Sequence, residues 1–211
     1  MIQDFSIFLK FLIEKNKQFN LTTITDELEA KEKHFNDSLQ GLEFLGKNII
    51  DIGAGAGFPG IVLALASEDK NFTLVETVGK KANFLIEAVK LLGLKNVTVI
   101  KSRVEDLDKT ILYDTAVVRA VAPLNVLIEY SLPYLKQGAT LLAYKGANYK
   151  EEIIAAKNAL SILGGEVDKI IEYTLNVAGE HFNRAIICIK KVKESPSGYP
   201  RSGNKPRLKP L

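Results

Sequence analysis

The stretch Asn48-Ile49-Ile50-Asp51-Ile52-Gly53-Ala54-Gly55-Ala56-Gly57-Phe58-Pro59-Gly60 joins an apolar strand pattern to an apolar helix pattern that begins at Ile61. Residues 53–60 hold four glycines. Glycine tolerates positive φ and lets a ligand approach the backbone, and the helix that follows presents unpaired N–H groups. A strand, a glycine-rich turn and a helix in this order predict a nucleotide-binding turn in an α/β sheet.

Two ligand classes compete for this turn. Residues 55–60 match the G-x-G-x-x-G pattern of dinucleotide-binding turns, which places a pyrophosphate at the helix N-terminus. Asp51 argues against that ligand, because a carboxylate two residues before the first glycine repels a diphosphate and suits the ammonium and sulfonium of S-adenosylmethionine. We therefore expect Asp51, Gly53, Gly55 and Gly57 to belong to an S-adenosylmethionine site.

A second strand pattern supplies an acidic residue at its carboxyl end. Glu76 closes the apolar run Phe72-Thr73-Leu74-Val75, and it follows Gly53 at the spacing where nucleotide-binding sheets place a ribose acceptor. Its two oxygens can accept hydrogen bonds from both ribose hydroxyls. A solvent-facing carboxylate is the alternative, and NAD enzymes use such an acid too. Glu76 therefore indicates a nucleoside more firmly than it identifies which one.

Length and composition indicate one globular domain. The chain has 211 residues, 46% of them hydrophobic, which is enough for a buried core. Its longest uncharged apolar stretch, residues 60–66, is far too short for a membrane span. The N-terminus lacks the pattern of a signal peptide, and the single cysteine, Cys188, lies in an apolar run. We expect a cytoplasmic protein that does not contact a membrane.

Positive charge is concentrated at the C-terminus. Residues 190–211 carry seven Lys or Arg and one Glu, whereas residues 1–189 carry 21 basic and 24 acidic side chains. Four prolines and two glycines in this segment argue against a helix and predict an extended basic arm. We expect it to bind nucleic acid and to leave cofactor affinity unchanged; a solubilising tail is the alternative. The candidate RNA-binding residues in the arm are Arg201, Lys205, Arg207 and Lys209.

Strand and helix patterns alternate after the glycine turn, as a doubly wound sheet requires. The last two strands are joined by a short turn region, residues 179–183, and should pair as an antiparallel hairpin. Seven strands that end in such a hairpin are typical of the Rossmann-like methyltransferase sheet. We expect a helical cap at 1–45, the methyltransferase domain at 46–193 and the basic arm at 194–211, packed as one compact unit. The expected strands are 49–52, 72–76, 97–101, 115–119, 139–145, 169–175 and 185–190, and the expected helices are 2–19, 28–44, 61–67, 80–92, 124–135 and 149–163.

The residues after the fourth strand bear on the methyl acceptor. Residues 118–123 read Val-Arg-Ala-Val-Ala-Pro, without the Asp/Asn-Pro-Pro-aromatic motif of exocyclic amine methylation. No cysteine is in reach to attack a pyrimidine C5, and no carboxylate cluster indicates a metal. Guanine N7 has a free lone pair at pH 7, so its methylation needs orientation and no general base. We therefore assign no catalytic acid or base and no metal ligand.

Further residues have expected or open roles at the site. Arg119, at a strand end, should hold the methionine carboxylate of the cofactor or an RNA phosphate. Val104 should pack on the adenine ring while the backbone of Val104 and Glu105 meets its polar edge. His34 and His181 are too isolated for a metal site. Their roles, and that of Asp37, stay open.

Eight segments of the chain together match a known family: 16–22, 34–39, 51–60, 79–81, 102–105, 119–120, 145–146 and the basic ending from 199. Through these segments the chain resembles, nearly from end to end, the bacterial ribosomal RNA small subunit methyltransferase G family, also called glucose-inhibited division protein B. The resemblance implies methyl transfer from S-adenosylmethionine to N7 of guanine 527 in the 530 loop of 16S rRNA. It also implies cofactor contacts at Gly53, Phe58, Val104, Glu105 and Arg119. Lys145 and Arg184, near the same end of the sheet, are further candidates for RNA binding.

Two other functions remain open from the residues alone. One is a small-molecule S-adenosylmethionine methyltransferase, which needs no basic arm. The other is a non-catalytic RNA-binding ribosome factor, which would bind cofactor without methyl uptake. The expected partner is 16S rRNA or the 30S subunit, and we expect a monomer.

Overall fold

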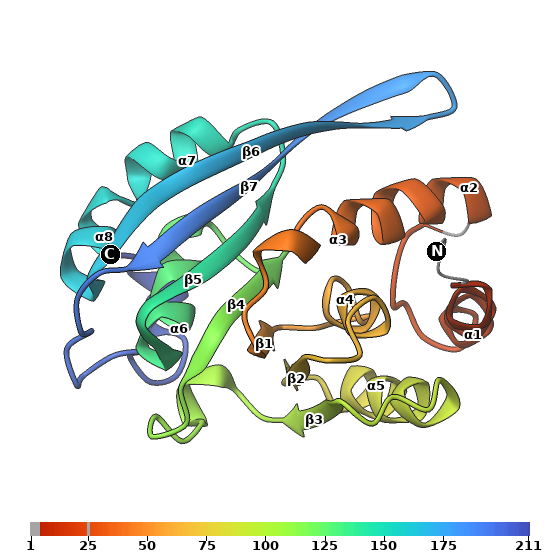
Figure 1. The fold of residues 1–211 in the computed structure, drawn as a ribbon, viewed down its shortest axis with the longest axis horizontal. Helices are drawn as coiled ribbons and strands as arrows, with labels where there is room; N and C mark the ends of the chain where they lie inside the picture. Colours follow the sequence, from red (N-terminus) through yellow and green to blue (C-terminus); the bar gives the residue numbers. More distant parts are fainter. Residues whose placement is uncertain (1–4, 25) are drawn as a thin grey trace.

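The computed structural model describes residues 5–24 and 26–211, and these residues form a seven-stranded sheet with the order β3-β2-β1-β4-β5-β7-β6 (Figure 1). Strands β1 to β5 pair in parallel, and β7 is antiparallel to both β5 and β6. This confirms the predicted methyltransferase sheet and its terminal hairpin. The strands are β1 Asn48–Ile52, β2 Asn71–Glu76, β3 Val97–Lys101, β4 Tyr113–Arg119, β5 Leu135–Lys145, β6 Gly165–Val177 and β7 Glu180–Lys191.

Helices cover both faces of the sheet (Figure 1). One face carries α1, α4 and α5, and the other carries α6, α7 and α8. Because successive strand residues point to opposite faces, neighbours such as Ile49 and Ile50 belong to different hydrophobic clusters. The helix bounds are α1 Ser6–Asn16, α4 Gly60–Leu65, α5 Gly79–Leu91, α6 Leu124–Ser131, α7 Tyr149–Ala155 and α8 Lys157–Leu163.

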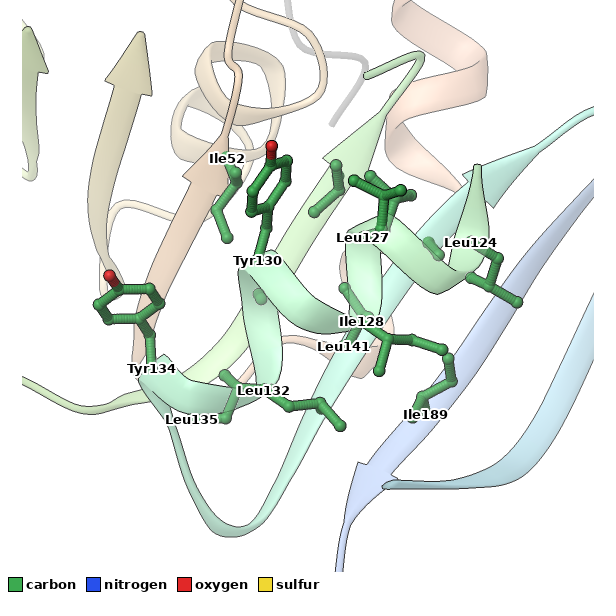
Figure 2. Close-up of a cluster of buried hydrophobic side chains, with 14 of the residues drawn as sticks. Ile52, Leu124, Leu127, Ile128, Tyr130, Leu132, Tyr134, Leu135, Leu141 and Ile189 are labelled. Carbon is green, nitrogen blue, oxygen red and sulfur yellow. The ribbon is translucent and has the colours of Figure 1, made fainter. Parts of the chain in front are cut away.

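Helix α6 fills the core on the second face. Figure 2 shows Leu124, Leu127 and Ile128 of this helix close to Leu141 of β5 and Ile189 of β7. All of these side chains are fully buried. Burying a side chain of this size contributes about 1.5 to 3 kcal/mol, so α6 is held firmly against the sheet. It therefore gives the residues at its ends fixed positions.

The N-terminal cap, expected as two or three helices, divides the segment 28–44 into shorter pieces. It divides into α2 Glu27–Ala30, a π-helical turn η1 Lys31–Asn36, α3 Asp37–Leu39 and a 3₁₀ turn η2 Leu42–Phe44. The π turn contains His34 and leads directly into Asp37. Single π turns inside helices re-aim side chains and occur often at functional sites. A smooth apolar periodicity does not reveal such a turn, because it predicts only that the segment is helical.

Other helix bounds also differ from the periodicity. The helix expected over 2–19 is α1, Ser6–Asn16, while residues 1–4 lie outside the described part of the chain. The Asn16 side chain binds the backbone of Leu21 and Thr22 and fixes the loop that follows. The segment 149–163 divides at Ala156 into α7 and α8. A 3₁₀ turn, η4 Leu132–Tyr134, follows α6 at the proline that interrupts its hydrogen bonding.

The β6–β7 hairpin is longer than expected. The two strands pair from Gly165 with Lys191 to Val177 with Glu180, and Ala178 and Gly179 form the turn with positive φ. The hairpin extends past the other strands toward the cap (Figure 1), where β6 contacts η1. Its length brings Tyr173 of β6 to the cap.

The C-terminal segment is a correction to the sequence analysis. We expected the prolines to prevent a helix and to leave an extended arm, but residues Lys205–Leu208 form a short helix, α9. Pro206 occupies an early helical position, where a missing N–H costs no intrahelical bond. Tyr199 and Leu211 pack against the core on the α6 face. The segment therefore folds back onto the body.

None of the helices in the described part of the chain is long and apolar enough to span a bilayer.

Gly60 begins α4 and lies against β1 and β2. Its backbone N–H donates to Asp51 Oδ2 at 2.8 Å. A Cβ at this position would fall on the Asp51 carboxylate and the Leu74 side chain. The helix approaches the sheet this closely because residue 60 has no side chain.

We expect Gly60→Ala to lower the free energy of unfolding by about 1 to 3 kcal/mol, the usual cost of overpacking a core. Urea denaturation followed by circular dichroism measures this change. Gly198→Ala is the control, because a Cβ there meets open space and the φ of Gly198 is not in the left-handed region. Equal stability of the two variants would contradict close packing at Gly60.

Candidate cofactor and substrate site

A cavity of about 460 Å³ lies at the carboxyl ends of β1 to β4. In sheets of this kind, ligands bind outside the carboxyl ends of the strands. Residues of the cap, the glycine turn, the strand ends and the C-terminal segment all contribute to its wall. Seven of the predicted cofactor residues line it: Gly53, Gly55, Phe58, Glu76, Val104, Glu105 and Arg119.

The glycine turn closes tightly over the end of β1. Gly53 and Ala54 both donate their N–H groups to the carbonyl of Val75, at 2.9 and 3.1 Å. Gly53 has φ 74°, and a Cβ there would lie 2.7 Å from the Val121 side chain. At Gly55, with φ 57°, a Cβ would meet only the Gly53 carbonyl, at 3.7 Å. The backbone at Gly55 is thus open for a ligand to approach.

Glu76 is fixed at the end of β2 by backbone donors. Gly55 N donates to Oε2 at 2.9 Å and Val78 N donates to Oε1 at 2.7 Å. The residue is 5% exposed, yet it lines the cavity. Each carboxylate oxygen has a further lone pair, so the group can accept two more hydrogen bonds. This arrangement fits a ribose with two adjacent hydroxyls.

The adenine end of the predicted site is at η3, Val104–Asp106. The Val104 side chain lines the cavity, but its carbonyl already accepts hydrogen bonds from the Tyr134 hydroxyl and from Leu107 N. Both lone pairs of that oxygen are used. The Val104 carbonyl therefore cannot also accept from an adenine amino group, while the expected contact of the Val104 and Glu105 backbone with the adenine edge stays a prediction. The Glu105 carboxylate, buried at the same wall, is an acceptor in that position.

Asp51 and Gly57 lie behind the turn and do not line the cavity. The Asp51 carboxylate, expected to face the cationic end of the ligand, is 1% exposed and accepts from Gly60 N, while its Oδ1 has no hydrogen-bond partner among the described residues. Burial raises the pKa of Asp51 to about 7, against the opposing effects of the Gly60 N–H and the Arg119 charge. Asp51 thus supports the turn from below. Gly57 packs on Ile61 and Phe8.

Arg119, at the end of β4, is held by the cap. Its Nη1 donates to Asp37 Oδ2 at 2.7 Å and to the Lys33 carbonyl at 2.9 Å, and the guanidinium lies 5.2 Å from the Phe58 ring centre. The side chain is 14% exposed. The fork that we expected to hold a carboxylate or phosphate is therefore directed at Asp37. The reason is that buried Asp37 requires a cationic partner.

His34 completes this cluster in its neutral form. Burial, followed by the charge of Arg119, lowers the pKa of His34 to about 4. Its Nδ1 faces Arg119 Nη2 at 3.3 Å and must accept, so Nε2 carries the hydrogen and donates to Thr22 Oγ1 at 2.8 Å. The ring stacks on Phe58 with centroids 4.4 Å apart. His34 therefore joins the cap to the glycine turn.

A second cavity, of about 590 Å³, lies on the other side of Arg119. It shares His34, Arg119, Ala120 and Val121 with the first cavity. Three of the predicted RNA-binding residues line it: Arg119, Lys145 and Arg184. The shared wall is where a group bound in one cavity can meet a group bound in the other.

The C-terminal segment, which we expected as an extended arm, forms part of the wall of the first cavity. Asn204 and Arg207 line the cavity, and Arg207 Nη2 donates to the Val121 carbonyl at 3.1 Å. Arg201 is engaged by the buried Glu129, with Nη2 2.6 Å from Oε2 and Nε 2.8 Å from Oε1. Lys205 and Lys209 are exposed and line neither cavity.

Several residues of the site escaped the sequence analysis. Tyr130 and Thr22 line the first cavity and Glu152 lines the second. The Tyr173 hydroxyl donates to Asp37 Oδ1 at 2.7 Å. The sequence does contain one signal for this cluster, because His34 and Asp37 are polar residues within an apolar helical segment. His181 binds Asn176 in the hairpin, away from both cavities, and the described residues contain no cluster of groups able to hold a metal ion.

The sheet order, the glycine turn after β1 and the carboxylate at the end of β2 define the class I S-adenosylmethionine-dependent methyltransferases. Solved structures share this fold. The M. jannaschii TYW2 in complex with AdoMet matches with a TM-score of 0.59 at 16% identity, over 75% of this chain and 77% of that one. A SAM-dependent methyltransferase from Aquifex aeolicus matches with a TM-score of 0.57 at 18% identity, over 84% and 98%.

The chain belongs to the rRNA small subunit methyltransferase G family, whose model matches residues 1–182. It is 40% identical to the ribosomal RNA small subunit methyltransferase G of Lachnoclostridium phytofermentans, over 100% of this chain and 89% of that protein. It is also 40% identical to that of Syntrophomonas wolfei, over 97% of each. The resemblance found in the motifs is thereby confirmed.

Asp51→Asn should remove the pH-dependent loss of stability that ionisation of the buried Asp51 carboxyl causes. Burial raises the pKa of Asp51 from its usual 3.8 to about 7. The protonated carboxyl therefore contributes its full stability to the fold below pH 3.8, and this contribution is lost as the pH rises through about 7. We expect the stability difference, variant minus parent, to grow by about 2 to 4 kcal/mol between about pH 4 and about pH 8. Urea denaturation at several pH values measures it.

His34 serves as an internal control for that comparison. Because its pKa is lowered, its contribution has the opposite sign and is lost as the pH falls from its usual 6.5 toward about 4. It titrates in both proteins and therefore cancels in the difference. A difference independent of pH would show that Asp51 is ionised in the fold throughout this range.

Arg207→Ala should weaken S-adenosylmethionine binding by about 0.5 to 1.5 kcal/mol, because it removes a hydrogen-bonding part of the cavity wall. Isothermal titration calorimetry measures the change. Lys205→Ala is the matched control, since it removes the same charge from the same short helix at an exposed position outside the cavity. If both variants bind cofactor like the parent, the C-terminal segment acts only elsewhere.

Proposed function

We propose that this chain methylates N7 of guanine 527, in the 530 loop of 16S rRNA. Membership of its family establishes the reaction as S-adenosylmethionine-dependent methylation of 16S rRNA. The state of the shared wall supports N7 as the acceptor. Both ring nitrogens of His34, both oxygens of Asp37 and the fork of Arg119 are engaged with one another, with the cap or with Tyr173 of β6. Such a wall suits an acceptor atom that needs no proton removed.

The first cavity fits the cofactor in its polar groups. Glu76 offers two oriented acceptors for the ribose, and Gly55 offers open backbone. Glu105 and the Val104 side chain form the end expected for the adenine. S-adenosylmethionine, when bound, supplies an electrophilic methyl group for in-line attack by a lone pair. The chain's own contribution is to hold the two reactants in line and to exclude water.

The second cavity is the place that we propose for the target base. Lys145 and Arg184 give it a positive lining, and the Arg184 side chain, in β7, has no hydrogen bond or ion pair among the described residues. An arginine in that state is available for a phosphate. Exposed Lys205 and Lys209 extend the positive surface along α9. We infer that a monomer acts on 16S rRNA or the 30S subunit in the bacterial cytoplasm, where ribosomal RNA resides.

Methyl transfer from tritiated S-adenosylmethionine to unmethylated 16S rRNA and to 30S subunits tests the function. We expect N7-methylguanosine at position 527, located by reduction and aniline cleavage, with at least one of the two substrates. Glu76→Gln should retain RNA binding and lose most of the methyl transfer at low cofactor concentration, because one ribose acceptor becomes neutral. RNA binding without methyl uptake by the parent would favour a non-catalytic ribosome factor, and label at another atom would overturn the N7 assignment.

A further inference from the structure

The second cavity contains an ion pair that the proposed reaction has not used. Lys145 is the last residue of β5, and Glu152 lies in the first helical turn after it, in α7. Lys145 Nζ is 2.6 Å from Glu152 Oε2, and the two side chains are 7% and 30% exposed. Both line the cavity, together with Arg119 and Val121 of the wall it shares with the cofactor cavity.

The hydrogen bonds of this pair leave one donor beside one acceptor. Lys145 donates to the Ala122 carbonyl at 2.8 Å and to Glu152 Oε2, so one of its three N–H groups remains. Glu152 Oε2 also accepts from Leu124 N at 2.7 Å, whereas Oε1 has no hydrogen-bond partner among residues 5–24 and 26–211. The fixed oxygen holds the carboxylate in place, and the other oxygen offers two lone pairs.

A fixed donor next to a fixed acceptor matches the hydrogen-bonding groups on the edge of guanine and mismatches those of adenine. Guanine presents an acceptor at O6, then donors at N1 and at the 2-amino group. Adenine presents an amino group in place of O6 and a bare nitrogen at N1, so it would place donor against donor and acceptor against acceptor. Unmatched buried polar groups of this kind reject a base strongly.

We propose that Lys145 and Glu152 select guanine as the methyl acceptor, with the Lys145 ammonium donating to O6 and Glu152 Oε1 accepting from N1–H and the 2-amino group. The inference rests on the proposed function, and it assigns the base preference to two side chains. O6 and N7 lie on the same edge of guanine. A base held by O6 at Lys145 therefore turns its N7 toward the neighbouring wall of Arg119 to Val121.

A structural role of Glu152 predicts something different. By accepting from Leu124 N, Glu152 also caps the first turn of α6, and any change of its charge affects that helix. Such an effect lowers activity equally for every base. Only a direct contact makes the loss depend on which groups the base carries, so a comparison of two bases separates the two roles.

The experiment compares 16S rRNA carrying guanosine or inosine at the target position, since inosine lacks only the 2-amino group. The parent should show a kcat/KM about 10- to 100-fold lower on inosine, the loss of one hydrogen bond to a charged group. Glu152→Gln should lower kcat/KM on guanosine by a similar factor but change kcat/KM on inosine only slightly. The preference of this variant for guanosine over inosine should therefore fall to within about 3-fold. Because the ratio is compared between proteins, an effect of inosine on the RNA fold cancels.

Glu151→Gln is the matched control, because Glu151 precedes Glu152 in the same helix, is exposed and lines neither cavity. It should keep the parent's preference. Equal rates of the parent on the two bases, or an undiminished preference in Glu152→Gln, would overturn the role of Glu152. A parent that methylates neither RNA would overturn the proposed function itself, and the base assignment with it.

Discussion

The ion pair between Arg119 and Asp37 connects the N-terminal cap to the sheet at the boundary of the two cavities. It joins residues 82 positions apart, and both side chains are nearly excluded from water. Removing one partner of such a pair typically costs about 3 to 5 kcal/mol, because the other charge stays buried alone. Burial, followed by the charge of Arg119, keeps His34 beside this pair in its neutral form, and the His34 ring stacks on Phe58 of the glycine turn. The position of the shared wall therefore depends on the docking of the cap.

The parts of this fold that the sequence revealed are those set by local pattern. Apolar runs placed the strands, four glycines placed the turn, and the end of a strand placed Glu76. The long-range pairs were not predictable in this way. Arg119 with Asp37 and Arg201 with Glu129 lie 82 and 72 positions apart, and a periodicity states that a charge is present without stating which partner folding brings to it. The π turn at Lys31–Asn36 was hidden for a related reason, since it changes side-chain direction without changing the apolar pattern.

The C-terminal segment shows how composition can mislead. A run of basic residues and prolines indicates a solvated arm, and for Lys205 and Lys209 that description agrees with their exposure. However, Glu129 is completely buried in α6 and requires a cation, and Arg201 supplies it with two side-chain hydrogen bonds. That anchor, with Tyr199 and Leu211 packed on the core, brings Arg207 to the first cavity. One short segment thus combines an exposed positive surface with a structural wall.

The two cavities and the wall between them differ in the hydrogen-bonding groups that they leave free. At the shared wall the polar side chains satisfy one another, so they have little capacity to move a proton and serve mainly to hold position. The first cavity has oriented acceptors for a nucleoside at Glu76, whose geometry is set by backbone donors of its own loop. The second cavity retains unused hydrogen-bonding capacity at Lys145, Glu152 and Arg184. In the N7 methylation that we propose, no general base is needed, so discrimination between acceptors must come from binding. It would then depend on the groups of the second cavity that are still free to bind.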